Sequence, residues 1–172
     1  MRNRPPLDPA TLERAALRYA ERYATTRAKL AAYLGRKLVE RGWAGAYPPD
    51  VDRLVGKMAE LRYVDDAAFA MARATALGRR GYGARRVSAA LKAAGVAQEE
   101  GAEAREAANA GAWAAALRFA ERRRIGPFAP EESDRAARDK AFAAMVRAGH
   151  SVALAGRIVR ARPGEIPEED GS

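Results

Sequence analysis

A seven-residue stretch, Ala16-Leu17-Arg18-Tyr19-Ala20-Glu21-Arg22, returns almost unchanged as Ala116-Leu117-Arg118-Phe119-Ala120-Glu121-Arg122. A second pattern, a large apolar residue followed four positions later by glycine, occurs at Leu38/Gly42, Leu91/Gly95 and Met145/Gly149. The three glycines are 53 and 54 residues apart. Self-similarity at a fixed period is typical of repeat architectures, and the two patterns together predict three copies of one unit of roughly 50 residues.

Hydrophobic periodicity predicts three helices within each unit. In the first unit, Leu30, Leu34 and Leu38 recur every four residues and form one apolar stripe. The expected helices cover about 9–23, 26–41 and 49–62 in the first unit, 65–78, 84–94 and 98–108 in the second, and 110–124, 131–148 and 151–162 in the third.

Helix-start signals support several of these boundaries. Asp8, Asp65 and Ser151 precede expected helices and can accept hydrogen bonds from their first free backbone N–H groups. We expect Glu131 and Glu132 in the first turn of the eighth helix, where negative charge complements the helix dipole.

No segment shows the alternating pattern of a β-strand, so the sequence predicts an all-α fold. Units of this size bury little surface alone, and we expect three tandem three-helix repeats that stack into an elongated, curved molecule. The predicted organisation is an N-terminal arm at 1–9, repeats at 10–64, 65–109 and 110–162, and an acidic, disordered tail at 163–172.

The composition favours a polyanionic partner. The 172 residues include 31 Lys and Arg against 22 Asp and Glu, a formal net charge of +9.

There is no cysteine, which excludes disulfides and thiolate chemistry. No apolar run approaches the roughly 18 residues of a membrane span, and the first ten residues lack the apolar stretch of a signal peptide. We therefore expect a cytoplasmic protein.

The sequence does not offer the groups that catalysis needs, so we expect no enzyme activity, no cofactor and no metal. The one histidine, His150, takes the place after glycine that Trp43 and Val96 hold in the other units. This equivalence favours a packing or helix-start role. The neighbouring Asp65 and Asp66 are interpreted as a helix cap rather than as a metal pair.

The basic residues carry the functional signal. No acidic residue occurs between Asp66 and Glu99, a stretch that includes two helices and the loop Gly81-Tyr82-Gly83. Pairs of cations seven residues apart also lie on the expected outer face of the second helix of every unit. The candidate residues for binding a nucleic acid or a nucleoprotein are Arg79, Arg80, Tyr82, Arg85, Arg86, Lys92, Lys29, Arg36, Arg122, Arg123, Arg124, Lys140 and Arg147.

Simpler roles fit the same residues. The cation pairs also suit an ordinary solvated surface, and the cations at 122–124 also suit the C-terminal end of a helix. Tyr82, between two glycines and among arginines, fits stacking on a base as well as anchoring the loop in the core.

The second unit resembles the RecX family, regulators of the RecA recombinase. The residues that carry the resemblance are Tyr63-Val64-Asp65-Asp66, Phe69-Ala70, Arg79-Arg80-Gly81-Tyr82-Gly83 and Arg86-Val87. The other units match in layout, and the resemblance covers about residues 10 to 162. The chain departs from the family pattern at Ala67-Ala68 and Ala89-Ala90, where polar or charged residues are usual.

The resemblance implies three tandem three-helix repeats and a non-catalytic regulator, which we expect to be a monomer. Its partner would be the RecA filament on single-stranded DNA, whose ATPase, extension and strand exchange it would inhibit. The resemblance fits a direct contact with DNA as well as a contact through RecA. It also fits three modes of action on the filament: capping its end, wedging into its groove and disassembling it. The short turns and basic second helices also fit a helix-turn-helix protein acting directly on DNA, and a pure protein scaffold is a further alternative.

Overall fold

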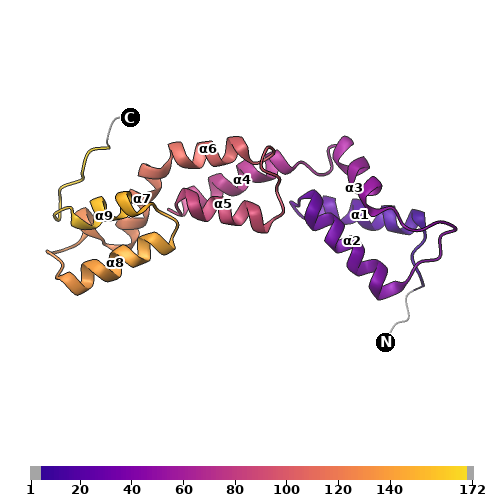
Figure 1. The fold of residues 1–172 in the computed structure, drawn as a ribbon, viewed down its shortest axis with the longest axis horizontal. Helices are drawn as coiled ribbons and strands as arrows, with labels where there is room; N and C mark the ends of the chain where they lie inside the picture. Colours follow the sequence, from indigo (N-terminus) through magenta and orange to yellow (C-terminus); the bar gives the residue numbers. More distant parts are fainter. Residues whose placement is uncertain (1–4, 170–172) are drawn as a thin grey trace. The chain divides into compact units, whose positions relative to one another are not determined.

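The computed structural model describes residues 5–169. Within this range the regular elements are helices, and the predicted all-α class is confirmed (Figure 1). They are α1 (Pro9–Arg22), α2 (Arg27–Arg41), α3 (Val51–Glu60), α4 (Asp66–Arg79), α5 (Ala84–Ala93), α6 (Ala102–Ala110), α7 (Ala112–Arg123), the short 3-10 helix η1 (Gly126–Phe128), α8 (Arg135–Arg147) and α9 (Val152–Arg160).

The chain divides into two compact units. Unit 1 comprises Met1–Ala70 with Lys92–Glu100, and unit 2 comprises Met71–Leu91 with Gly101–Ser172. The division passes through α4 and α5, so compactness alone does not separate three repeats. The predicted repeat boundaries therefore stay a prediction. The outermost parts of the predicted arm and tail, residues 1–4 and 170–172, lie outside the described range.

In unit 1, helices α1, α2 and α3 pack against one another around a core of leucine, valine, methionine and alanine side chains. Leu7, within the predicted N-terminal arm, is fully buried in this core. Its N–H donates to the Gly42 carbonyl at 3.0 Å, and its carbonyl accepts from the Ala44 N–H at 2.8 Å. Leu7 of the predicted arm therefore contributes to the core of unit 1.

In unit 2, helices α7, α8 and α9 pack together around Phe119, Met145 and Ile158. The expectation that Glu131 and Glu132 lie in the first turn of α8 was wrong. The helix begins at Arg135, because the Asp134 carboxylate accepts from the Ala137 N–H at 2.7 Å and caps it.

The helix expected at 98–108 was also placed too early. It begins at Ala102, after a turn, and ends at Ala110. Its sequence is mostly alanine, so it offers no apolar stripe from which the register can be read.

The three glycines of the repeat pattern all have positive φ angles. Gly42, Gly95 and Gly149 have φ angles of 75°, 72° and 96°. They follow α2, α5 and α8, respectively. At the end of a helix, a residue with positive φ turns the chain in a new direction, and glycine adopts this conformation with little strain. This shared conformation supports the repeat prediction.

Candidate functional site

The loop between α4 and α5 is fixed by close backbone contacts. Gly81 has a φ angle of 72°, and a Cβ atom there would lie 2.8 Å from the Phe119 backbone nitrogen on α7. A Cβ atom on Gly83 would lie 2.3 Å from the Gly149 carbonyl oxygen. The Gly83 N–H donates to the Ala148 carbonyl at 2.9 Å. Both glycines are therefore needed for the loop to pack against α7 and the α8–α9 turn.

His150 holds the same loop from inside the protein. Its side chain is buried, and its Nε2 atom lies 3.0 Å from the Gly81 carbonyl oxygen. The carbonyl accepts a hydrogen bond, so Nε2 carries the proton. Burial lowers the pKa of His150, and the hydrogen bond to Gly81 opposes part of this shift. The predicted packing role of His150 is confirmed.

Tyr82 lies between the two glycines and is half-buried against the core of unit 2. The Arg80 and Arg86 guanidinium groups lie 5.4 and 5.8 Å from the centroid of its ring, within the range of cation–π attraction. Of its two predicted roles, this packing favours the loop anchor. The ring also positions two arginines at the surface.

Arginines of α7 reach the end of α4. Arg118 Nη1 donates to the Gly78 carbonyl at 3.4 Å, and Arg122 Nη2 donates to the Arg80 carbonyl. The last carbonyls of a helix carry partial negative charge, so cations are favourable there. Because a guanidinium has five N–H donors, most of those on Arg122 stay available for a ligand.

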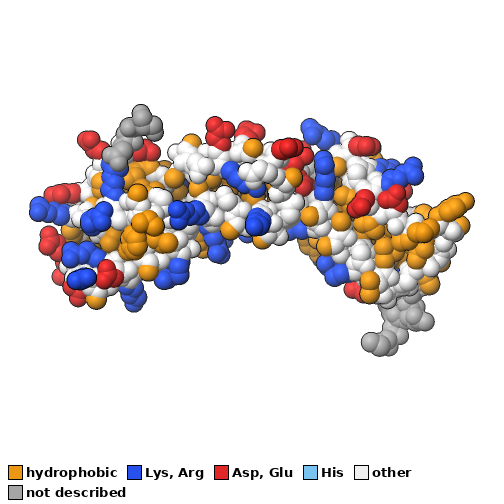
Figure 2. Space-filling model, in the orientation of Figure 1, with side chains coloured by type: hydrophobic (Ala, Val, Ile, Leu, Met, Phe, Trp, Pro, Cys, Tyr) orange, Lys and Arg blue, Asp and Glu red, His pale blue; other side chains and the backbone are white. Residues whose placement is uncertain are grey.

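Five arginines on this loop, on the adjoining helices α4 and α5, and on α7 are exposed. We call Arg79, Arg80, Arg85, Arg86 and Arg122 the loop cluster. Within residues 5–169, none of the five forms an ion pair with an acidic side chain. Figure 2 shows Lys and Arg side chains over α5, whereas acidic side chains gather over α6. The cluster is a basic surface on a backbone fixed by glycine contacts and a buried histidine.

The other predicted residues are exposed but are not part of this cluster. Lys29 and Arg36 lie on α2 in unit 1, where Lys29 Nζ lies 4.7 Å from the centre of the Phe69 ring. Lys92 lies at the end of α5. The remaining predicted residues are Arg123 and Arg124 at the end of α7, and Lys140 and Arg147 on α8.

The adjacent aspartates cap two different helices. Asp65 accepts from the Ala68 N–H at 2.9 Å and caps α4, as predicted. Asp66 is buried and accepts from the Arg27 N–H at 2.9 Å, which caps α2 from a position 39 residues away in sequence. Sequence reasoning missed this second cap because its partner is distant in the chain.

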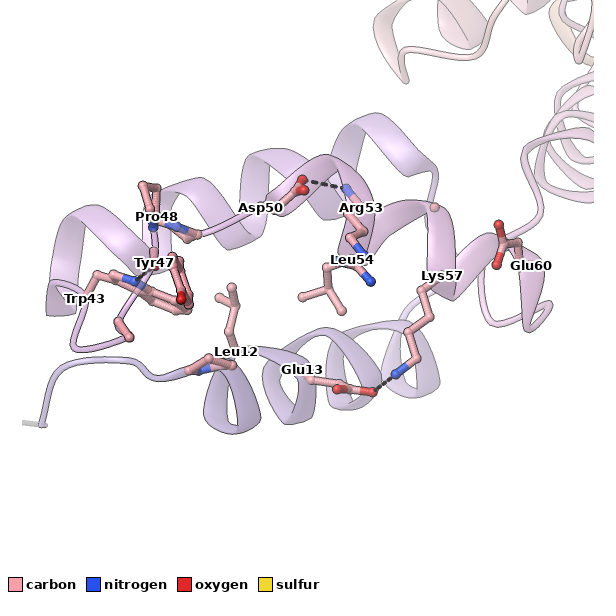
Figure 3. Close-up of a pocket in the computed structure, with 14 residues that line it drawn as sticks. Leu12, Glu13, Trp43, Tyr47, Pro48, Asp50, Arg53, Leu54, Lys57 and Glu60 are labelled. Atoms are coloured by element: carbon pink, nitrogen blue, oxygen red, sulfur yellow. Dashed lines mark hydrogen bonds and ion pairs between the residues drawn. The ribbon is translucent and has the colours of Figure 1, made fainter.

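A groove between α1 and α3 was also not predicted (Figure 3). It has a volume of about 800 Å³, and Trp43, Tyr47 and Leu54 supply apolar side chains to it. An ion pair between Lys57 Nζ and Glu13 Oε1, at 2.6 Å, lies along its edge.

A second group of aromatic and cationic side chains lies on α1 and α2 in unit 1. Tyr19, Tyr23 and Tyr33 have ring–ring contacts, and Arg18, Arg22 and Lys37 line the same depression. The sequence did contain a signal for this group, because the residues of each pair Tyr19/Tyr23, Arg18/Arg22 and Tyr33/Lys37 are four apart and therefore neighbours on one helix face. The pairing of the two helices could not be read from that spacing.

Comparisons with known proteins identify the family. No model of a protein family matches the sequence. The chain is 32% identical over 170 residues to the Regulatory protein RecX of Myxococcus xanthus (strain DK1622), an alignment that covers 91% of this chain and 88% of that protein. None of the helices described in residues 5–169 is long and apolar enough to cross a membrane. The identity and its coverage confirm the resemblance to the RecX family that was based on residues 63–87. The chain belongs to the RecX family of regulatory proteins.

Proposed function

We propose that this chain is a non-catalytic regulator that binds the RecA filament on single-stranded DNA. It inhibits the RecA ATPase, filament extension and strand exchange. Under this proposal the chain acts as a monomer in the cytoplasm, within homologous recombination, DNA repair and the SOS response. The observation that carries the proposal is the loop cluster, whose exposed arginines lie on a fixed backbone and form no ion pair with any acidic side chain of residues 5–169.

The physical argument rests on charge and rigidity. A cation without an acidic partner keeps its full attraction for phosphates or for acidic side chains on a partner protein. A binding group on a fixed backbone also loses little conformational entropy when it is bound. A protein held on a filament in this way opposes the movements between RecA subunits that accompany ATP turnover.

Co-sedimentation with RecA filaments tests the proposal. The full chain should pellet with RecA on single-stranded DNA more completely than with either component alone. The double variant Arg85→Glu/Lys92→Glu should pellet less, because both side chains lie on the exposed face of α5, away from the buried Val87 and Leu91. For any direct DNA contact, each lost phosphate contact should lower the slope of log affinity against log salt by about 0.7.

A matched control separates this surface from net charge. Arg14→Glu/Arg138→Glu makes the same change in charge at exposed arginines of α1 and α8, outside the predicted site, and should pellet like the wild type. If both double variants lose binding equally, net charge explains the interaction, and neither Arg85 of the loop cluster nor the neighbouring Lys92 of α5 does. Tight binding to one fixed duplex sequence without RecA would instead support the helix-turn-helix alternative.

A further inference from the structure

The depression on α1 and α2 combines stacked aromatic rings with cations. The Tyr19 and Tyr33 rings lie with centroids 4.1 Å apart and planes 16° apart, and Tyr23 lies 5.2 Å from Tyr19 at 51°. These three rings, with Arg18, Arg22 and Lys37, line an open depression of about 510 Å³. All six residues belong to unit 1.

Packing explains only part of this arrangement. Tyr19 and Tyr33 pack against the core of unit 1 and are half-buried. Tyr23 is not part of that core, and 49% of its surface is exposed. A large aromatic ring held beside another ring at the surface is suited to stacking with a flat ligand.

The charges around the rings suit an anion. Arg22 lies 5.5 Å from the centre of the Tyr23 ring, and Lys37 Nζ lies 5.8 Å from that of Tyr33. Glu40 pairs with Lys37 at 2.6 Å and offsets one positive charge. Arg18 and Arg22 are exposed and form no ion pair within residues 5–169. The depression therefore keeps a net positive charge.

We propose that this depression binds unpaired bases of single-stranded DNA, with a base stacked on Tyr23 and the flanking phosphates near Arg18 and Arg22. Alternating flat π-faces and phosphates are the chemistry that such a surface recognises. In a duplex the base faces are already stacked on one another, so this contact selects single strands. The inference rests on the proposed function, in which the chain meets single-stranded DNA within the RecA filament. It adds a direct contact between the chain and that DNA.

Fluorescence anisotropy with a labelled oligothymidylate of roughly 15 nucleotides tests the contact without RecA. Tyr23→Ala should weaken binding by at least about 5-fold, since one base–aromatic stack contributes about 1–3 kcal/mol. Tyr23→Phe keeps the ring and should bind like the wild type. Tyr47→Ala removes a tyrosine that is 83% exposed elsewhere in unit 1 and should have no effect. Binding of duplex DNA should be the same for all four proteins.

Cross-linking gives a second readout on the unaltered protein. An oligonucleotide that carries 5-iodouracil should cross-link at Tyr23 or Tyr33, which fall in the separate tryptic peptides 23–27 and 30–36. Wild-type affinity of Tyr23→Ala, or cross-links confined to other peptides, would overturn the inference, as would a preference for the matching RNA oligomer. RecA is absent from both assays, so a failure to inhibit RecA would refute the proposed function and leave these results standing.

Discussion

Replacing Gly81 by alanine tests whether the loop that carries the basic cluster is fixed by close backbone contact with α7. The alanine must adopt a φ angle of 72°, and its Cβ would lie 2.8 Å from the Phe119 nitrogen and 3.1 Å from the Ala115 carbonyl oxygen. Both atoms belong to the backbone of α7, so they cannot move away as a flexible side chain does.

The expected cost follows from these two effects. The left-handed conformation costs an alanine about 1–2 kcal/mol. Overpacking against a rigid neighbour adds about 1–3 kcal/mol. The free energy of unfolding of unit 2 should therefore fall by about 2–5 kcal/mol. Each kcal/mol lowers the Tm by about 2–4 °C in a chain of this size, so we expect a drop of at least about 4 °C.

Tryptophan fluorescence can follow unit 2 separately. The sequence has two tryptophans, Trp43 in unit 1 and Trp113 in unit 2. In a Trp43→Phe background, thermal melting reported by Trp113 gives the stability of unit 2. The matched control is Gly78→Ala, because a Cβ atom there meets nothing within 4 Å. It lies within α4 and should stabilise the protein by roughly 0.5–1 kcal/mol.

The two variants should therefore change the Tm in opposite directions. Gly81→Ala should also weaken filament binding at temperatures where unit 2 stays folded, because it displaces the loop that positions Arg80 and Arg86. Equal Tm values for the two variants would refute the reasoning, since Gly81 would then have neither a strained backbone nor a close neighbour.

Two further predictions concern buried polar groups. Burial lowers the pKa of His150 below its ordinary 6.5, so the unfolded chain binds the proton more readily. The stability that the neutral ring confers is complete above pH 6.5 and is lost as the pH falls toward the pKa in the folded state. Denaturant unfolding should show a loss between pH 7.5 and 5.5 that His150→Gln lacks, and an equal loss in both proteins would contradict this role. Asp66→Ala should lower the stability of unit 1 by about 0.5–2 kcal/mol, measured with Trp43 fluorescence in a Trp113→Phe background, whereas Asp66→Asn keeps an acceptor for the Arg27 N–H and should cost less. Identical losses for alanine and asparagine would show that the cap is not the cause.

Local signals in the sequence were sufficient for most of the fold. Asp8, Asp65 and Ser151 cap helices through backbone groups three residues away, so each cap can be read from a short segment. The predicted start of the eighth helix was wrong because two glutamates and Asp134 compete as start signals within four residues. The side chain of Asp134 accepts the capping hydrogen bond. Composition alone does not decide which of these acidic residues does so.

The candidate site depends more on contacts between distant segments. The basic character of residues 79–86 was evident in the sequence, and so was the exposure of α5 opposite Val87 and Leu91. The bond from His150 to Gly81 spans 69 residues, and the Arg122 bond to the Arg80 carbonyl spans 42. Sequence spacing gives the face of one helix, whereas it does not give which helices meet.

The single-stranded-DNA-dependent ATPase of RecA from the same organism tests the central claim most directly. Under the proposed function, the full chain should inhibit it at less than one molecule per RecA, because one bound molecule would restrain several subunits of the filament. Inhibition should be stronger when the chain is added during filament growth than after assembly, and it should be weaker for Arg85→Glu/Lys92→Glu than for Arg14→Glu/Arg138→Glu. Absence of inhibition at an equimolar ratio in moderate salt would contradict the account.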